Sequence, residues 1–479
     1  MSRKGYVSVF STRYAGAEMQ YLFSEEFKFT TWRRLWTALA RAEKELGLPI
    51  SEEQLSELDA NIDNINYEAA EARESQVRHD VMSHVYAYGL QCPSAAGVIH
   101  LGATSCYVGD NTDIIIMRRA LAIIRKKLLR LIELLADFSD KYKALPCLGY
   151  THLQPAQLTT LGKRAATWLY DFYLDYLEVK RRESELALLG SRGATGTQAS
   201  FLELFEGDEA KVEVLEGKIA SELGFERVVP VSGQTYTRKQ DYLVLSALAS
   251  LAASASKLAT DLRLLASFKE VEEPFEEHQI GSSAMPYKRN PMRSERVCAL
   301  ARYLMAELLN PLLTEASQMF ERTLDDSANR RLSISESFLC ADAILNILLN
   351  ICKSPVVYER VIAARIEAEL PFMATENILM EAVKRGGDRQ LLHERLREHS
   401  LAAADKVKLE GRENDLLERI AADESFSLTL DELKTMLNPQ KFTGLAARQT
   451  ESFLKEYIRP LLDENKALLS EIDVEDIKV

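Results

Sequence analysis

One long amphipathic segment of the sequence, TDIIIMRRALAIIRKKLLRLIELLADFSDKY, runs from Thr112 to Tyr142. Its apolar residues recur every three or four positions, which is the periodicity of a helix with one buried face. At 1.5 Å per residue this segment would form a helix about 45 Å long. The same periodicity covers residues 158–188, 238–267 and 292–318, where Pro311 predicts a kink. These segments exceed ordinary globular helices in length and therefore predict a long-helix bundle.

Strand signals are almost absent, with no sustained alternation of apolar and polar residues and no Asn-Gly turn, so the expected fold class is mainly α. A glycine-containing connection, LGATSCYVGDN, ends at residue 111, and Pro355 interrupts the last long helix. We therefore expect an N-terminal helical domain over 1–111, a central bundle over 112–357 and a C-terminal helical domain over 358–479. In the bundle, SALASLAASASKLA gives a helix face of small residues that is expected to have a partner.

Composition limits the partners and the compartment. Asp and Glu total 72 against 59 Lys and Arg, a formal charge of −13 in 479 residues, which argues against bulk binding of nucleic acid or acidic membranes. The six cysteines form no CxxC pair and no zinc-ligand spacing with His, as expected of reduced thiols in a cytoplasmic protein. We expect no signal peptide, no lipidation and no membrane span, since the apolar uncharged stretch from Tyr242 is shorter than about 20 residues and rich in serine.

The segment GSSAMPYKRNP, residues 281–291, interrupts the helical pattern. Proline lacks an amide donor and glycine disfavours helical order, so the segment is either a spacer or a site. Gly-Ser-Ser is common in flexible linkers. However, Lys288, Arg289, Arg293 and Arg296 crowd one short stretch of an acidic protein, and such crowding is costly unless an anion is present.

Two histidines stand in polar surroundings, His79 in RHDVMSH and His152 in YTHLQPAQ. Each could be a hydrogen-bonded structural residue. Metal binding is the weaker functional interpretation, because His79 and His84 are five residues apart and miss the spacing of a helical zinc pair. Further donors suited to carboxylate or phosphate occur in three segments: Arg322, Ser327, Arg330 and Arg331 in FERTLDDSANRR, Gln234 in SGQTYTRKQ, and Arg13 and Tyr14 in STRYAG.

The interrupting segment resembles the signature loop of the fumarase/aspartase superfamily, Gly-Ser-Ser-x-Met-Pro-x-Lys-x-Asn-Pro, at every fixed position. Its continuation YKRNPMRSERVCALAR, with RHDVMSHV, HLGATSCYVGDN, YTHLQPAQLTTLGKR and RTLDDSANRR, resembles the adenylosuccinate lyases of eukaryotic type. The resemblance covers nearly the whole chain. It implies the three-domain fold of the superfamily, in which the central helices of four chains form a tetrameric core.

The resemblance also implies a reaction, the reversible β-elimination of fumarate from adenylosuccinate and from succinylaminoimidazole carboxamide ribotide in purine nucleotide synthesis. Ser282 corresponds to the general base, and its alkoxide needs backbone amides and a cation, for which Lys288 is the local candidate. His152 corresponds to the general acid, and His79 to a second histidine that binds or orients the substrate. The segment over 281–291 would then be a catalytic lid.

The resemblance further implies substrate-binding residues, no metal or organic cofactor, and a homotetramer whose active sites combine several chains. The implied binding residues are Arg13, Tyr14, Arg78, Asp80, Thr104, Ser105, Gln234, Asn290, Arg296, Arg322, Ser327 and Arg331. Two alternatives remain open at this point: another lyase of the superfamily such as argininosuccinate lyase, and a non-catalytic helical scaffold. The joint presence of Ser282, Lys288, His79 and His152 disfavours the scaffold.

Overall fold

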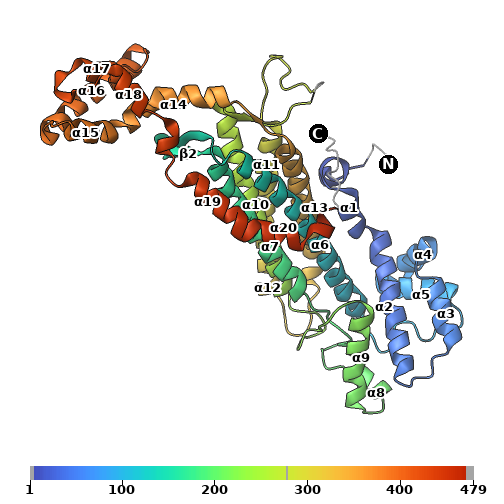
Figure 1. Cartoon of the computed structure of the whole chain (residues 1–479). Helices are drawn as coiled ribbons and strands as arrows, with labels where there is room; N and C mark the ends of the chain where they lie inside the picture. Colours follow the sequence, from blue (N-terminus) through green and yellow to red (C-terminus); the bar gives the residue numbers. More distant parts are fainter. Residues whose placement is uncertain (1–4, 277–278, 471–479) are drawn as a thin grey trace.

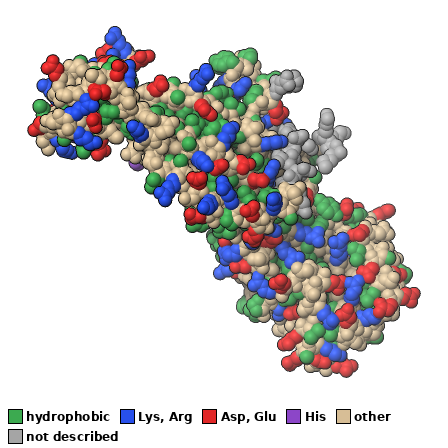
Figure 2. Space-filling view, in the orientation of Figure 1, with side chains coloured by type: hydrophobic (Ala, Val, Ile, Leu, Met, Phe, Trp, Pro, Cys, Tyr) green, Lys and Arg blue, Asp and Glu red, His purple; other side chains and the backbone are tan. Residues whose placement is uncertain are grey.

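The computed structural model describes residues 5–276 and 279–470. The chain is mainly α, as expected, and it is elongated, with a central bundle of long helices between two smaller helical regions (Figure 1). Acidic and basic side chains are intermixed over the visible face, and hydrophobic side chains are frequent along the bundle (Figure 2).

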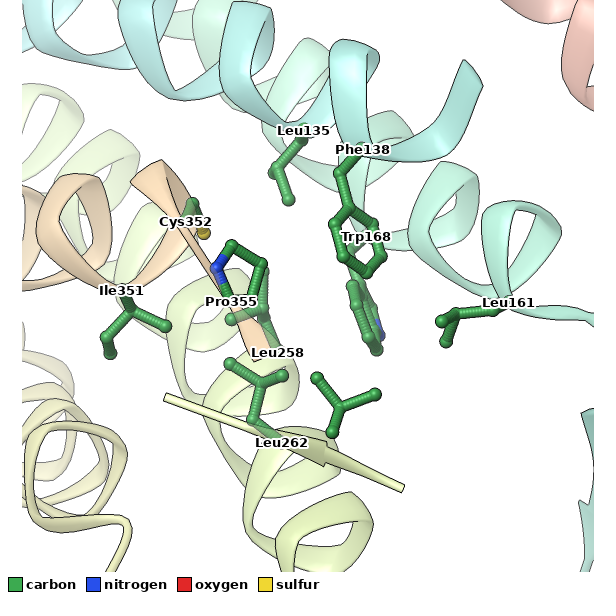
Figure 3. A pocket seen from close by; sticks show the side chains of 10 residues that line it. Leu135, Phe138, Leu161, Trp168, Leu258, Leu262, Ile351, Cys352 and Pro355 are labelled. Carbon is green, nitrogen blue, oxygen red and sulfur yellow. The ribbon is translucent and has the colours of Figure 1, made fainter. Parts of the chain in front are cut away.

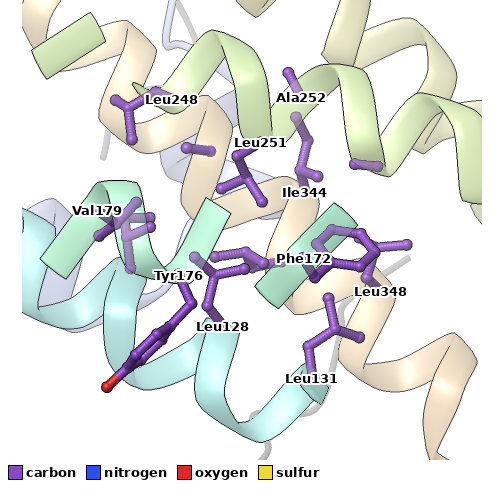
Figure 4. Packing of buried hydrophobic residues seen from close by; sticks show 14 of the residues in the cluster. Leu128, Leu131, Phe172, Tyr176, Val179, Leu248, Leu251, Ala252, Ile344 and Leu348 are labelled. Carbon is purple, nitrogen blue, oxygen red and sulfur yellow. The ribbon is translucent and has the colours of Figure 1, made fainter. Parts of the chain in front are cut away.

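The bundle consists of long helices whose apolar stripes face one another. In Figure 4, Leu128, Phe172, Leu251 and Ile344 come from four different helices and pack into one buried cluster. The main helices are α6 (Ser105–Lys141), α7 (Leu161–Glu185), α10 (Lys239–Ser267), α11 (Met292–Glu307) and α13 (Asp325–Lys353). Helix α6 begins at Ser105, seven residues before the start at Thr112 that the apolar periodicity predicted, because the more polar residues 105–111 are also helical.

The small residues of α10 have a different role from the one expected. Ala247, Ala252 and Ala255 are buried within the same chain, where α10 packs against α7 and α11. Its exposed positions include Ser250 and Ala253. The small-residue pattern is therefore explained by close packing inside one bundle, and it does not by itself require a second chain.

The predicted kink near Pro311 is confirmed, but the break occurs at Leu308, between α11 and α12 (Leu309–Ala316). A proline removes the hydrogen bond that its own N–H would donate to the carbonyl four residues earlier, and its ring crowds that carbonyl. Here the affected carbonyl is that of Glu307, the last residue of α11. The helix therefore ends N-terminal to the proline.

Strands are few, as expected, but the described residues include one hairpin that the sequence did not signal. Strands β1 (Pro146–Thr151) and β2 (Gln154–Thr160) form an antiparallel hairpin, with a bulge between Leu148 and Tyr150. His152 and Leu153 form its two-residue turn, and both have positive φ angles, 54° and 58°. Positive φ at both central positions matches a type I′ turn, which usually contains Asn and Gly. The sequence lacks those residues, so the turn signal was missing. A short pair, β3 (Val271–Glu272) and β4 (Val356–Val357), closes the same end of the bundle.

The N-terminal region has its own hydrophobic cluster, centred on Trp32 and Trp36 of α2. Helices from the middle of the sequence complete it, because Phe201 and Leu215 pack into the same cluster. Its elements are η1 (Phe10–Tyr14), α1 (Ala17–Leu22), α2 (Glu25–Glu45), α3 (Glu52–Ala60), α4 (Tyr67–Val77) and α5 (Asp80–Gln91), joined by α8 (Ala199–Leu204) and α9 (Glu209–Glu222).

The C-terminal region packs around Ile378, Leu392 and Phe426. The chain then returns to the bundle, where Leu454 and Ile458 join the central cluster. Its elements are α14 (Glu359–Met373), α15 (Thr375–Lys384), α16 (Arg389–Glu410), α17 (Leu416–Ala422), η2 (Glu424–Phe426), α18 (Leu430–Met436), η3 (Pro439–Phe442), α19 (Ala446–Phe453), η4 (Leu454–Ile458), α20 (Arg459–Glu464) and α21 (Lys466–Leu469). Position 111 lies inside α6, so the predicted boundary there falls within one continuous helix, whereas position 357 is the last residue of β4.

Three helical segments, Lys239–Ser267, Met292–Ala316 and Asp325–Lys353, are long and apolar enough to cross a membrane by length and composition alone. The apolar window of the third is 83% buried inside the chain, where it supplies bundle core. That of Met292–Ala316 is only 33% buried. The sequence analysis considered only the uncharged stretch from Tyr242, and it therefore missed the length and apolar character of these three helical segments. The absence of a membrane span stays a prediction.

Candidate active site

A cavity of about 740 Å³ lies where the N-terminal region meets one end of the bundle. Its walls come from α2, the start of α5, the start of α6, the connecting segment 234–238, and residues 322–335, which include the first turns of α13. Eight of the residues predicted from the sequence line it: Arg78, His79, Asp80, Ser105, Gln234, Arg322, Ser327 and Arg331. This volume is within the range of small-molecule sites.

His79 is fixed by the turn that starts α5. Its Nδ1 accepts a hydrogen bond from the backbone N–H of Met82 at 3.3 Å and so caps the helix. In a neutral ring the proton is then on Nε2, which lies 3.3 Å from Ser105 Oγ. Arg78, one residue earlier, has φ of 55°, a left-handed conformation that is uncommon for a residue with a side chain. Such local strain is frequent at functional sites.

A buried ionic network forms the floor of the cavity. The Arg238 guanidinium donates to Asp110 at 2.9 Å and to Asp326 at 2.7 Å, and all three side chains are almost fully buried. Burial alone would lower the pKa of Arg238, but Asp110 and other nearby groups raise it above its ordinary value. Burial favours the neutral form of Asp326, yet Arg238 and Arg322 hold its pKa below the ordinary value. The network therefore stays ionised and rigid.

A second buried pair extends this floor. Arg330 donates to Asp241 at 2.6 Å and lies 2.9 Å from Asp113, and the Tyr236 hydroxyl donates to Asp241 at 2.7 Å. The guanidinium of Arg330 is thus neutralised within the chain, so it differs from its neighbour Arg331, which is exposed. The sequence did not identify Arg238, Asp110 or the partners of Arg330. The one sequence feature that could have indicated Arg238 is its position directly before the long apolar helix α10.

His152 lies far from this cavity, at the exposed tip of the β1–β2 hairpin. The hairpin is anchored from below: the Tyr150 hydroxyl accepts a hydrogen bond from Arg365 at 2.9 Å, and its ring stacks on Phe268 at 5.3 Å. Holding His152 and Leu153 at positive φ costs free energy, on the order of 1 kcal/mol for each. The strained turn presents the exposed imidazole of His152 to solvent.

The 281–291 segment is an exposed loop that precedes α11. Ser282 Oγ accepts hydrogen bonds from the backbone N–H groups of Met285 at 3.2 Å and Ala284 at 3.4 Å. The Asn290 side chain donates to the carbonyl of Gly281 at 2.8 Å and closes the base of the loop. A Cβ on Gly281 would lie 2.3 Å from the carbonyl oxygen of Lys288, so this close approach requires glycine. Lys288 itself is exposed.

The basic crowding after this loop has an internal explanation. Arg293 pairs with Glu276 at 2.6 Å, and Arg289 lies 3.7 Å from Glu272. Arg296 instead faces the ring of Tyr14, with its guanidinium carbon 5.7 Å from the ring centroid. The inference that the four cations need an external anion was therefore too strong, because acidic residues just before the loop neutralise part of the charge.

The predicted site residues consequently fall into two groups at opposite ends of the bundle (Figure 1). The cavity group lies where α6 and α10 begin, and Thr104 precedes α6 there. The loop group, which contains His152, Ser282, Lys288, Asn290 and Arg296, lies where the same helices end. Arg13 and Tyr14 lie between the two groups, because the carbonyl of Tyr14 accepts a hydrogen bond from Asn346, which also binds Lys127 near the middle of α6. Helix α6 has 37 residues, so its two ends are about 55 Å apart. One chain cannot bring the two groups together.

Other histidines of the N-terminal region are poor candidates for acid–base chemistry. His84 stacks on Phe29 with ring centroids 3.8 Å apart, and burial lowers its pKa to about 4. His100 accepts a hydrogen bond from Trp36, and burial lowers its pKa to about 4 as well. Both are neutral packing residues at pH 7. Within residues 5–276 and 279–470, no group of three or more His, Cys, Asp or Glu side chains is arranged to hold a metal ion.

A second, much smaller cavity of about 20 Å³ lies inside the bundle (Figure 3). Only apolar side chains and proline line it, among them Phe138, Trp168 and Cys352. A void of this size holds at most one water, and no polar group is present to bind one. It is a packing defect and not a substrate site.

Comparison with known proteins gives the family. A family model described as Lyase matches residues 17–305, and one described as Adenylosuccinate lyase C-terminus matches residues 371–453. The chain is 51% identical to adenylosuccinate lyase from Saccharomyces cerevisiae over 472 residues, 98% of each chain. It is 50% identical to that from Schizosaccharomyces pombe over 473 residues, again 98% of each. This chain belongs to the adenylosuccinate lyase family. The predicted membership in the fumarase/aspartase superfamily is thereby confirmed.

More distant solved structures share the fold. The 3-carboxy-cis,cis-muconate lactonizing enzyme from Pseudomonas putida superposes with a TM-score of 0.82 over 94% of this chain and 99% of its own, at 22% identity. A fumarate lyase from Mesorhizobium superposes with a TM-score of 0.78, also at 22% identity. These likenesses confirm the mainly α architecture expected for the adenylosuccinate lyase family.

Proposed function

We propose that this chain catalyses the reversible β-elimination of fumarate from adenylosuccinate, leaving AMP, and from succinylaminoimidazole carboxamide ribotide, in purine nucleotide synthesis. The observation that carries the proposal is 51% identity over 98% of the chain to an adenylosuccinate lyase. The chemistry of the cavity agrees with it. The substrates carry a phosphate and two carboxylates, and the cavity offers Arg78, Arg331 and Ser327 as donors.

The base of this elimination must remove a proton from the carbon next to a carboxylate, and Ser282 is proposed for that role. A serine hydroxyl is a weak base at neutral pH, so its anionic form has to be stabilised. Two backbone N–H groups already point to Ser282 Oγ, and hydrogen bonds to an oxygen favour its charged form. Lys288, six residues further along the same loop, can add positive charge when the loop closes.

The departing purine nitrogen needs a proton, and His152 is proposed as the acid. An imidazole has an ordinary pKa close to neutrality, which suits donation at physiological pH. The strained hairpin supports this role, because it holds the ring away from its own chain where a neighbouring chain can use it. His79, with Ser105 beside it, is proposed to orient the substrate inside the cavity.

We propose that the complete site forms only in a homotetramer, because the cavity and the loop lie at opposite ends of α6, a helix about 55 Å long. Antiparallel packing of two bundles would place the loop group of one chain over the cavity of another. Exposed apolar residues support such an association: Tyr170, Leu174 and Leu177 form a stripe along α7 and are 48%, 45% and 43% exposed. Isolated bundles leave such stripes in water, whereas association buries them.

We also propose that the protein acts in the cytoplasm. All six cysteines are buried and unpaired, which suits a reducing compartment. The substrates are intermediates of nucleotide synthesis, which agrees with that location.

The direct test is to incubate the purified protein with adenylosuccinate and to follow the ultraviolet spectrum of the purine as AMP forms. Argininosuccinate serves as the competing substrate. Turnover of argininosuccinate alone would assign the chain to a different lyase activity. Absence of turnover with either compound, in a folded tetramer, would leave the scaffold interpretation.

A further inference from the structure

Lys28 lies on the first turns of α2 and lines the large cavity. Its ammonium is 4.9 Å from the centroid of the Phe29 ring and 4.8 Å from that of the Trp32 ring. These two aromatic faces hold the side chain in place. No carboxylate within the described residues lies close enough to form an ion pair with it.

The other cations on the cavity floor are different. Arg238 and Arg330 are each bound by two carboxylates, and Arg322 is bound by Asp326 at 2.7 Å. Even Arg331 lies 3.6 Å from Asp80. Most of the positive charge at this site therefore neutralises fixed acids in ion pairs, whereas Lys28 forms no ion pair with the described residues and interacts with Asp80 and Asp113 only at longer range.

The surroundings of Lys28 make this unpaired charge costly. The side chain is partly buried, and burial lowers its pKa, while Asp80 and Asp113 raise it and Arg331 lowers it further. A desolvated cation without a counter-ion is unfavourable unless an anion is supplied. The Lys28 side chain is not fully enclosed, since it lines the cavity of about 740 Å³.

We propose that Lys28 is a further specificity-determining residue of this site, whose ammonium binds an anionic group of the substrate, either a carboxylate or the phosphate. The inference rests on the proposed function, and it adds a residue that no sequence motif indicated. The aromatic walls position the ammonium in advance, so less conformational freedom is lost when the anion binds. Cation–π contacts tolerate this arrangement because they do not consume the N–H donors of the ammonium.

The test compares Lys28→Met with the parent enzyme. Methionine keeps an unbranched stem to pack on Phe29 and Trp32 but removes the charge. We expect the KM for adenylosuccinate to rise about 10- to 100-fold, the range for losing one hydrogen bond to a charged group, while kcat changes by less than about threefold. Inhibition by the two products, AMP and fumarate, identifies the group bound: weaker inhibition by AMP indicates phosphate, and weaker inhibition by fumarate indicates carboxylate.

Two further variants control the experiment. Lys141→Met removes an exposed lysine that also lies over an aromatic ring, 4.9 Å from the centroid of Tyr142, but outside the cavity, and it should leave all constants unchanged. Lys28→Arg keeps the charge and should retain product inhibition within a few-fold. If the methionine variant is insoluble, Lys28→Gln serves as the uncharged form.

The inference is overturned if the uncharged variant keeps the parent KM and the parent inhibition by both products, or if kcat alone falls. Failure of the proposed function is a separate result, because it is decided on the parent enzyme, which would then turn over no adenylosuccinate at all.

Discussion

Glu43 on α2 should make this protein less stable as the pH rises. Its side chain is completely buried, and neither carboxylate oxygen has a hydrogen-bond partner in the structure. Burial raises its pKa from 4.5 to about 9. At pH 7 the folded protein therefore holds a neutral Glu43, whereas the unfolded chain ionises it.

The sign and size follow from proton linkage. Between pH 4.5 and about pH 9 the folded state binds one more proton than the unfolded state, so stability falls as pH rises through that window. Each pH unit costs about 1.4 kcal/mol, and the 2.5 units from pH 4.5 to pH 7 amount to about 3.4 kcal/mol. Glu43→Gln removes the ionisation but keeps a similar shape. The variant should match the parent near pH 4.5 and be about 3 kcal/mol more stable at pH 7.

The assay is urea unfolding at pH 5, 6, 7 and 8, at one protein concentration, followed by tryptophan fluorescence. Trp32 and Trp36 lie on the same helix as Glu43, and a Trp168→Phe background restricts the signal to that region. Glu45→Gln is the matched control: Lys218 lowers the pKa of Glu45 below 4.5, so this residue is ionised in both states from pH 5 to pH 8 and its difference from the parent should stay constant over that range. A difference between Glu43→Gln and the parent that stays constant from pH 5 to pH 8 would refute the reasoning.

The remaining predictions concern the active site. Ser282→Ala should lower kcat at least about 100-fold while adenylosuccinate still binds, because proton abstraction is lost; near-normal turnover in a steady-state assay would direct the role of base elsewhere. His152→Gln should lower elimination by about 10²- to 10⁴-fold and remove the limb of the pH–rate profile that reports the acid; persistence of that limb would point to His79. Mixing the inactive Ser282→Ala and His79→Gln proteins under subunit exchange should restore partial activity, since hybrid sites receive an intact loop and an intact cavity. Recovery for Ser282→Ala mixed with His152→Gln would show in addition that these two residues reach one site from different chains. Mass measurement must show that mixed tetramers form, and mixed tetramers without activity would contradict the shared site.

The sequence determined the class of fold and the identity of the loop. Apolar periodicity over long segments left a helical bundle as the only way to bury those faces, and the break at Leu308 followed from Pro311 because a missing N–H acts locally. The loop at residues 281–291 was recognisable because glycine, serine and proline in fixed order are incompatible with a helix. These features depend on chemistry within a few residues along the chain.

Only the tertiary structure decided which charges are available to a ligand. In the sequence, Arg330 and Arg331 look alike, but the fold buries the first between Asp241 and Asp113 and leaves the second exposed. Lys28 gave no sequence signal at all, because its role depends on Trp32 beside it and on walls that come from distant segments. Ion pairing is set by distances of a few ångströms between residues far apart in sequence, and no local pattern encodes them.

The backbone of the hairpin that carries His152 could not be predicted from local sequence either. Its turn takes positive φ at a histidine and a leucine, which local preference disfavours, so packing of Tyr150 and Gly149 has to impose it. The separation of His152 and Ser282 from the cavity also follows from helix length and direction within the fold. The residue types in the sequence indicated the chemistry of this site. The length of the rigid helix α6 separates the cavity from the loop, and for this reason one chain holds only part of the site.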